Sequence, residues 1–278
     1  MLAAVLALGA SVAWGIADFL GGIKSRVVPL LVVLLLAQPV GFVGIGVLVA
    51  IAGNAPPGRS VLWAIPAALL GTIGIAAFYR GMAVGSISII APIVAVAAVV
   101  PVAFGVATGD DVSSAQWLGF VLALGGVALA SLELDAAAGG TRVATGVGWA
   151  VAAIIGFGGY YVPMHEASEQ DFLWATWIFR GSVTLLVLAA WLLPRPPLSA
   201  ARGSIGAIMV IGILDSAGNA LFAASASEGA VSVVSVLATL YPVTTVALAA
   251  IVLGERVQRV QRLGVLAALA GVALISAG

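Results

Sequence analysis

The sequence predicts an all-α integral membrane protein with ten transmembrane helices, arranged as two inverted five-helix repeats. Three observations lead to this fold class: a very apolar composition, hydrophobic runs of membrane-spanning length, and a duplication of the chain. Hydrophobic residues make up 63% of the 278 residues and charged residues only 8%, with a mean hydropathy of +1.23. Soluble domains carry about 25% charged residues, so the expected surrounding is the lipid bilayer.

The same composition excludes several classes of protein. A net charge of zero gives no reason to expect a nucleic-acid partner, and the absence of cysteine excludes a disulfide framework and thiolate chemistry. His165-Glu166 would begin a zinc-protease motif only with a second histidine at position 169, which is Glu169. We therefore expect no catalytic residue, no metal site, no cofactor and no enzyme activity.

Apolar runs of about 17 to 25 residues can cross a bilayer as helices, and polar or Pro/Gly breaks divide this chain into ten of them. The predicted spans lie near residues 2–22, 28–52, 61–83, 86–108, 116–132, 144–164, 172–193, 205–226, 230–253 and 263–278. The fifth and tenth spans are short, and little more than Gly85 separates the third from the fourth, so eight spans are an alternative. The duplication favours ten, because eight would require one half to lose a helix that its copy keeps.

The chain repeats itself at an offset of 143 to 145 residues. Residues 119–131 return as residues 264–276 with eight of thirteen positions identical. We expect a first repeat at residues 1–134, a connecting loop at 135–145 and a second repeat at 146–278. Both copies keep small residues four apart, Gly119 with Ala123 and Gly264 with Ala268, which permit close helix contact. This pattern indicates architecture, with a homodimer surface as the alternative, so a monomer or a homodimer is expected.

Five helices per half require the second half to enter the membrane in the opposite direction to the first. The loop charges agree, since Lys24 and Arg26 follow the first span, whereas the matching connection of the second half carries Glu166, Glu169 and Asp171. Lys and Arg accumulate on the cytoplasmic side. The even-numbered connections hold Arg59 alone, and the odd-numbered ones hold Lys24, Arg26, Arg142, Arg195, Arg202, Arg256, Arg259 and Arg262. This count places both termini outside the cytoplasm.

Four ionisable residues lie well inside the predicted spans: Asp18, Arg80, Arg180 and Asp215. Each costs at least about 2.5–3.5 kcal/mol near the bilayer centre, so each needs a partner or a wet cavity. By depth, Arg180 and Asp215 could meet at the midplane, and Asp18 and Arg80 could form a second pair nearer one surface. Each pair fits either a structural link between helices or part of a binding site.

Polar and aromatic side chains share helical faces with these charges. Trp14 lies four residues before Asp18, Trp177 three before Arg180, and Asn219 one turn after Asp215. Closely spaced glycines precede Tyr160 and Tyr161, and they permit close backbone approach beside these rings. Aromatic residues in membrane helices are nevertheless more often packing residues. The candidate substrate-binding or coupling residues are Trp14, Asp18, Tyr79, Arg80, Tyr160, Tyr161, Trp177, Arg180, Asp215 and Asn219.

Several short motifs suggest a family. The inverted five-helix halves, Trp14-Gly15 in the first span, Tyr241-Pro242 in the ninth, and Gly254-Glu255 followed by Gly264 and Gly271 resemble the EamA-like family of the drug/metabolite transporter (DMT) superfamily. The resemblance implies a secondary active transporter in the cell inner (plasma) membrane, usually an exporter of small metabolites, amino acids or drugs. It also implies cytoplasmic termini, against the charge count.

The first half departs from this pattern, with Asp110 in place of Glu and Ala97 where Pro is expected. Inverted repeats support alternating access, with the small-molecule site near the midplane between the halves. A proton is the candidate coupling ion, on Asp18 or Asp215, and Arg80 or Arg180 would suit a substrate carboxylate or phosphate. The alternatives are an intramembrane lipid-handling enzyme or flippase-type subunit, and a non-transporting scaffold with a filled interior.

Overall fold

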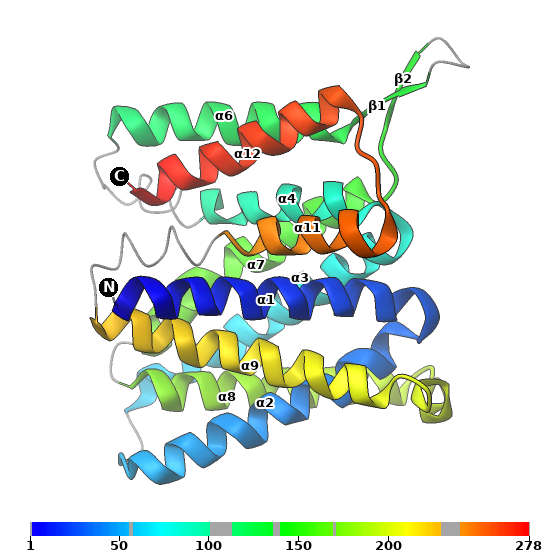
Figure 1. Cartoon of the computed structure of the whole chain (residues 1–278). Coiled ribbons are helices and arrows are strands. Elements are labelled where there is room, and N and C mark those ends of the chain that lie inside the picture. The colour runs from blue at the N-terminus through cyan, green and yellow to red at the C-terminus, as the bar shows by residue number, and fades with distance from the viewer. Residues whose placement is uncertain are drawn as a thin grey trace.

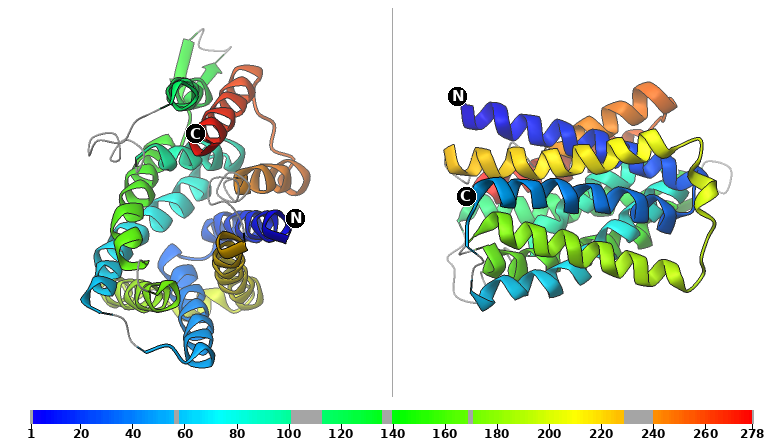
Figure 2. Two further views of the ribbon diagram at one scale, coloured as in Figure 1. Left: turned by 90° about the vertical axis from the view of Figure 1, so that its left-hand side faces the viewer. Right: turned by 90° about the horizontal axis from the view of Figure 1, so that it is seen from below.

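The computed structural model describes residues 2–55, 58–100, 113–135, 140–168, 171–228 and 240–277. Its long helices lie side by side with their axes roughly parallel or antiparallel, and the view along the axes shows them end on (Figures 1 and 2). Large apolar side chains cover much of the outer surface; Ile155, for example, is 64% exposed and Leu185 is 66% exposed. An apolar exterior of this extent is what a helix bundle presents to lipid.

Two helix ends of the first half form at residues with clear capping signals in the sequence. Gly53, at φ 67°, ends the second helix, and Ser113 begins the sixth through a capping box with Gln116. The elements are α1 (Leu2–Val27), α2 (Leu30–Ala52), a 3₁₀ helix (Arg59–Trp63), α3 (Ala64–Val84), α4 (Ile87–Ala95), a second 3₁₀ helix (Val96–Ala98) and α6 (Ser114–Ser131).

The connection between the halves is a hairpin, where the sequence predicted only a loop. Strands β1 (Leu132–Asp135) and β2 (Gly140–Val143) pair antiparallel, with Leu132 opposite Val143. The hairpin projects from the end of the bundle beyond α6 (Figure 1). The all-helical fold class is confirmed for the bundle, and the hairpin is confined to this short connection.

Two helix ends of the second half also form at a polar or a glycine residue. The Asp171 carboxylate accepts a hydrogen bond from the Trp174 backbone N–H at the start of the eighth helix, and Gly254, at φ 63°, ends the eleventh. The elements are α7 (Val147–Ser168), α8 (Phe172–Leu192), a 3₁₀ helix (Leu198–Ala201), α9 (Ile205–Glu228), α11 (Tyr241–Leu253) and α12 (Arg259–Ala277).

Six helical segments among the described residues are long and apolar enough to cross a membrane: Leu2–Val27, Leu30–Ala52, Arg59–Val84, Val147–Met164, Phe172–Leu192 and Ile205–Phe222. Two shorter apolar helices cover Ser114–Ala130 and Tyr241–Leu253. Parts of the predicted spans 86–108 and 230–253 lie outside the described residues. The predominantly helical membrane class is confirmed, whereas the count of ten spans stays a prediction.

Most close packing joins the two halves of the chain. Helix α1 packs on α9 and α11, and α7 packs on α3 and α4; α2 packs on α8, and α6 on α12. Helix α4 contacts α3, α6, α7, α11 and α12, and all nine of its residues are buried.

Helices α6 and α12 touch backbone to backbone through glycines. A Cβ added at Gly126 would lie 2.6 Å from the Gly264 carbonyl oxygen, and one added at Gly264 would lie 2.7 Å from that of Gly126. The same relation joins Gly119 and Gly271, at 2.9 and 2.6 Å. The close helix contact expected from the small-residue pattern is confirmed. It forms within one chain, between α6 of the first repeat and α12 of the second.

Candidate functional site

An ion pair between a buried arginine and a partly exposed aspartate joins α8 to α9 inside the bundle. One terminal nitrogen of Arg180, Nη1, donates to Asp215 Oδ2 at 2.5 Å and to Gln38 Oε1 of α2 at 3.1 Å. The arginine side chain is 6% exposed and the aspartate side chain 33%. The structure thus brings together the Arg180–Asp215 pair expected from sequence depth.

The pair lies near the middle of both helices. Arg180 follows the start of α8 by eight residues and Asp215 follows the start of α9 by ten, which at 1.5 Å per residue is about 12 and 15 Å. Each distance is about half the helix length. The charges therefore lie at mid-depth in the bundle, on two helices of the second half, and Gln38 on α2 of the first half contacts the same arginine.

Glycine makes room for this arginine. A Cβ added at Gly41 of α2 would lie 3.3 Å from Arg180 Cδ, 3.4 Å from Arg180 Nε and 2.6 Å from Ser216 Oγ. The buried Nε has no hydrogen-bond partner among the described residues. A buried guanidinium donor without a hydrogen-bond partner is unfavourable, so this position favours an added acceptor.

Asp18 and Tyr79 complete the cluster from α1 and α3. Asp18, partly buried, lies within electrostatic range of Asp215, and Tyr79 lies within range of Asp18, Asp215 and Arg180. The tyrosine side chain is buried with its ring against Gly21. We define the central polar cluster as Asp18, Gln38, Tyr79, Arg180 and Asp215.

Arg80 does not join Asp18. It is exposed and makes no ion pair with any residue that the structure describes. Successive residues of a helix point about 100° apart, so Tyr79 facing the interior turns Arg80 toward the outer surface. The second ion pair expected from sequence is therefore not formed.

Trp14, Trp177 and Asn219 make local contacts near the cluster. Trp14 lies against Gly218 of α9. Trp177 stacks on Phe42 of α2, with ring centroids 5.5 Å apart and an interplanar angle of 3°. The Asn219 side chain donates to the Asp215 backbone oxygen at 2.9 Å, so it does not contact that carboxylate through this bond. Trp14 and Trp177 therefore pack between helices, whereas the Asn219 hydrogen bond lies within α9.

The two adjacent tyrosines of α7 are placed less fully. The ring of Tyr160 packs against Phe179 of α8, at 5.3 Å between centroids. The side chain of Tyr161 lies outside the described residues. Gln38, by contrast, is a member of the cluster that sequence reasoning missed; its signal was a polar side chain within an apolar span, directly before Pro39.

A second polar network lies where α3, α4 and α11 end or begin. The Glu255 carboxylate accepts hydrogen bonds from Ser86 Oγ at 2.8 Å and from the backbone N–H groups of Ile87 and Ser88 at 3.3 and 2.9 Å. It also forms an ion pair with Arg26 at 3.3 Å. The second half thereby caps the N-terminus of α4, where a negative charge is favourable.

These hydrogen bonds decide the charge of Glu255. Burial would raise the pKa of its carboxyl group, but the bonds from Ser88, Ser86 and Ile87 outweigh burial and lower the pKa below 4.5. Arg26 also donates to the carbonyl oxygens of Met82 and Gly85 at the end of α3. The equivalent Asp110 lies outside the described residues.

Comparison with known protein families gives a match for the second half of the chain. Residues 144–277 match the EamA-like transporter family, a part of the DMT superfamily. The second half of this chain belongs to that family. The resemblance inferred from the Gly254-Glu255 motif is thereby confirmed. The match suggests a membrane transporter of the DMT type, and the EamA-like transporter family is generally non-enzymatic.

One solved structure, named only "Crystal structure of protein", resembles the EamA-like chain with a TM-score of 0.67. It is 17% identical, and the alignment covers 98% of this chain and 95% of that chain. At this identity the likeness shows the fold alone. No curated protein matches the sequence. Among the described residues, no group of three or more His, Cys, Asp or Glu side chains could hold a metal ion.

Proposed function

We propose that this protein is a secondary active transporter, an exporter of a small metabolite, amino acid or drug, and that the central polar cluster is its binding and coupling site. The observation behind this proposal is the Arg180–Asp215 pair at mid-depth on α8 and α9, whose arginine also binds Gln38 on α2 of the other half. Intramembrane charges mark substrate and ion pathways, because their burial in lipid is costly. We place the transporter in the cell inner (plasma) membrane as a multi-pass protein.

Matched contacts in the two halves support alternating access. Trp14 of α1 lies against Gly218 of α9, and Phe157 of α7 lies against Gly74 of α3. Trp14 and Phe157 are equivalent at an offset of 143 residues, and Gly74 and Gly218 at 144. Such reciprocity, also seen between α6 and α12, is expected of two inverted five-helix repeats. Repeats of this kind can exchange conformations around a fixed central site.

The contacts of each charge suggest its role. Asp18 makes no ion pair with any described residue, so it is the carboxylate that we assign to the coupling proton. Asp215 is already held by Arg180. The unpartnered Nε of Arg180 would donate to an anionic group of the substrate, such as a carboxylate. The intramembrane lipid-handling enzyme and the flippase-type subunit gain no support from the family match.

Transport by the purified protein in liposomes tests this proposal. Uptake and efflux are measured for amino acids, sugars and cationic drugs, with and without a pH gradient. The double variant Arg180→Gln/Asp215→Asn removes both charges and should slow transport at least about tenfold, which is about 1.4 kcal/mol. Asp18→Asn should make the remaining transport independent of the pH gradient.

Arg80→Gln is the matched control, because it removes an exposed arginine of the same bundle and should leave transport unchanged. Monodisperse elution and an unchanged unfolding temperature show that each variant is folded. If the folded double variant transported like the wild type, the ion pair would be a structural link and the assigned site would be wrong.

A further inference from the structure

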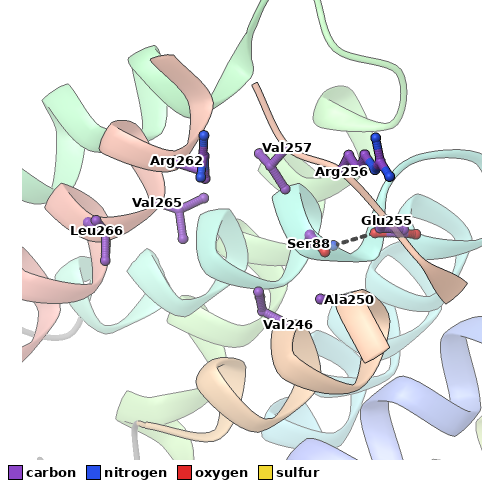
Figure 3. A pocket seen from close by; sticks show the side chains of 9 residues that line it. All are labelled: Ser88, Val246, Ala250, Glu255, Arg256, Val257, Arg262, Val265 and Leu266. Carbon is purple, nitrogen blue, oxygen red and sulfur yellow. Dashed lines mark hydrogen bonds between the residues drawn. The ribbon is translucent and has the colours of Figure 1, made fainter. Parts of the chain in front are cut away.

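A pocket of about 540 Å³ lies between α11 and α12, away from the central polar cluster (Figure 3). It occupies the place where the chain leaves one helix and enters the next. The pocket is lined by Ser88, Val246, Ala250, Glu255, Arg256, Val257, Arg262, Val265 and Leu266. Its size is ordinary for a small-molecule site, which spans about 300 to 1,000 Å³.

Charge and apolar surface occupy different parts of this pocket. Figure 3 shows Arg256 and Arg262 on the same rim, with Val246 and Ala250 of α11 on the opposite side. Both arginines are exposed, and neither has an ion-pair partner among the described residues. The nearby carboxylate of Glu255 is already bound by Arg26 and the start of α4. The rim therefore carries two positive charges that the described residues do not neutralise.

The pocket also reaches from the helix ends toward the membrane interior. Helix α11 ends at Leu253 and α12 begins at Arg259. Val246 and Leu266 each lie seven residues inside these ends, about 10 Å at 1.5 Å per residue. The arginine rim thus lies at the depth of lipid headgroups, and the apolar wall extends along the acyl region.

We propose that this pocket binds an anionic phospholipid of the bilayer. Its phosphate contacts Arg256 and Arg262, and the first part of an acyl chain lies against Val246 and Leu266. Arginine suits phosphate because its planar donors bind two oxygens at once, and basic pockets between membrane helices favour anionic headgroups. A soluble anion would contact only the two arginines of the rim, and a neutral lipid would contact only the apolar wall. The lipid stays bound and links α11 to α12 beside the Glu255 contact.

Native mass spectrometry tests the proposal on the full-length, delipidated protein in detergent. The protein is titrated with phosphatidylglycerol or with phosphatidylcholine of the same chain length. We expect one phosphatidylglycerol to bind at least about tenfold more tightly than phosphatidylcholine. The double variant Arg256→Gln/Arg262→Gln should lose that preference. The control Arg80→Gln/Arg202→Gln removes two exposed arginines elsewhere and should keep it.

A third variant separates lipid from soluble anion. Ala250→Trp narrows the apolar wall without a change in charge, and it should weaken phosphatidylglycerol binding. Equal binding of the two lipids to the wild type would overturn the proposal, as would a preference retained by the Arg256/Arg262 variant. If inorganic phosphate displaced the lipid and Ala250→Trp bound phosphatidylglycerol normally, the pocket would be a soluble-anion site and the lipid assignment would be wrong.

Discussion

Two adjacent glycines of α6 allow the contact between the halves to be tested with a matched pair of substitutions. Gly126 faces α12, whereas Gly125 is exposed and a Cβ added there would meet nothing within 4 Å. Gly126→Ala and Gly125→Ala therefore make the same chemical change one residue apart. Only the first places a methyl group between two helix backbones.

The structure sets the size of the effect. A Cβ on Gly126 would lie 2.6 Å from the Gly264 oxygen and 2.8 Å from Ala268 Cα. Both are backbone atoms, so relief requires α12 to move. Overpacking of this kind destabilises the protein by about 1–3 kcal/mol. Replacement of a helical glycine by alanine stabilises the helix by about 1 kcal/mol, and this gain is the same in both variants. We expect Gly126→Ala to be less stable than Gly125→Ala by about 1–3 kcal/mol.

Reversible unfolding in mixed micelles, followed by tryptophan fluorescence, measures the free energy of unfolding of both variants. Gly264→Ala is the reciprocal test, because its added Cβ would meet the Gly126 oxygen at 2.7 Å. It should be destabilised about as much as Gly126→Ala. If the two α6 variants differed by less than about 0.5 kcal/mol, the close backbone contact between the halves would be refuted.

Two further substitutions test the polar networks. Glu255→Gln should weaken the cap of α4. It should lower the free energy of unfolding near neutral pH by about 0.5–2 kcal/mol, and with it the unfolding temperature. Because folding lowers the pKa of Glu255, its charge stabilises the protein above about pH 4.5 and loses this effect as the pH falls through the folded pKa. Wild type and variant should therefore converge in acid, and a constant gap would contradict this role. Gly41→Ala should displace Arg180 and slow transport, whereas Gly44→Ala on the same helix meets open space and should not; equal liposome transport by both would contradict the assigned site.

Some of the site could be predicted because position along a helix sets depth. Arg180 and Asp215 were expected to meet from their distances to the helix ends, and they do. Depth alone did not distinguish Arg80, which points outward, from its neighbour Tyr79, which belongs to the cluster. Gln38 escaped notice because it carries no charge, although it shares the guanidinium of Arg180.

Composition and hydrophobic run length by themselves determined that this is a helical membrane protein, since both can be read from the chain without knowing any contact between distant residues. The family motif, with Glu255 at its centre, was also visible in the sequence. Only the tertiary structure decided which way each helix turns its polar side chains, and that Glu255 caps a helix of the other half. Rotation about a helix axis and contact between distant segments depend on packing, which no single helix determines alone.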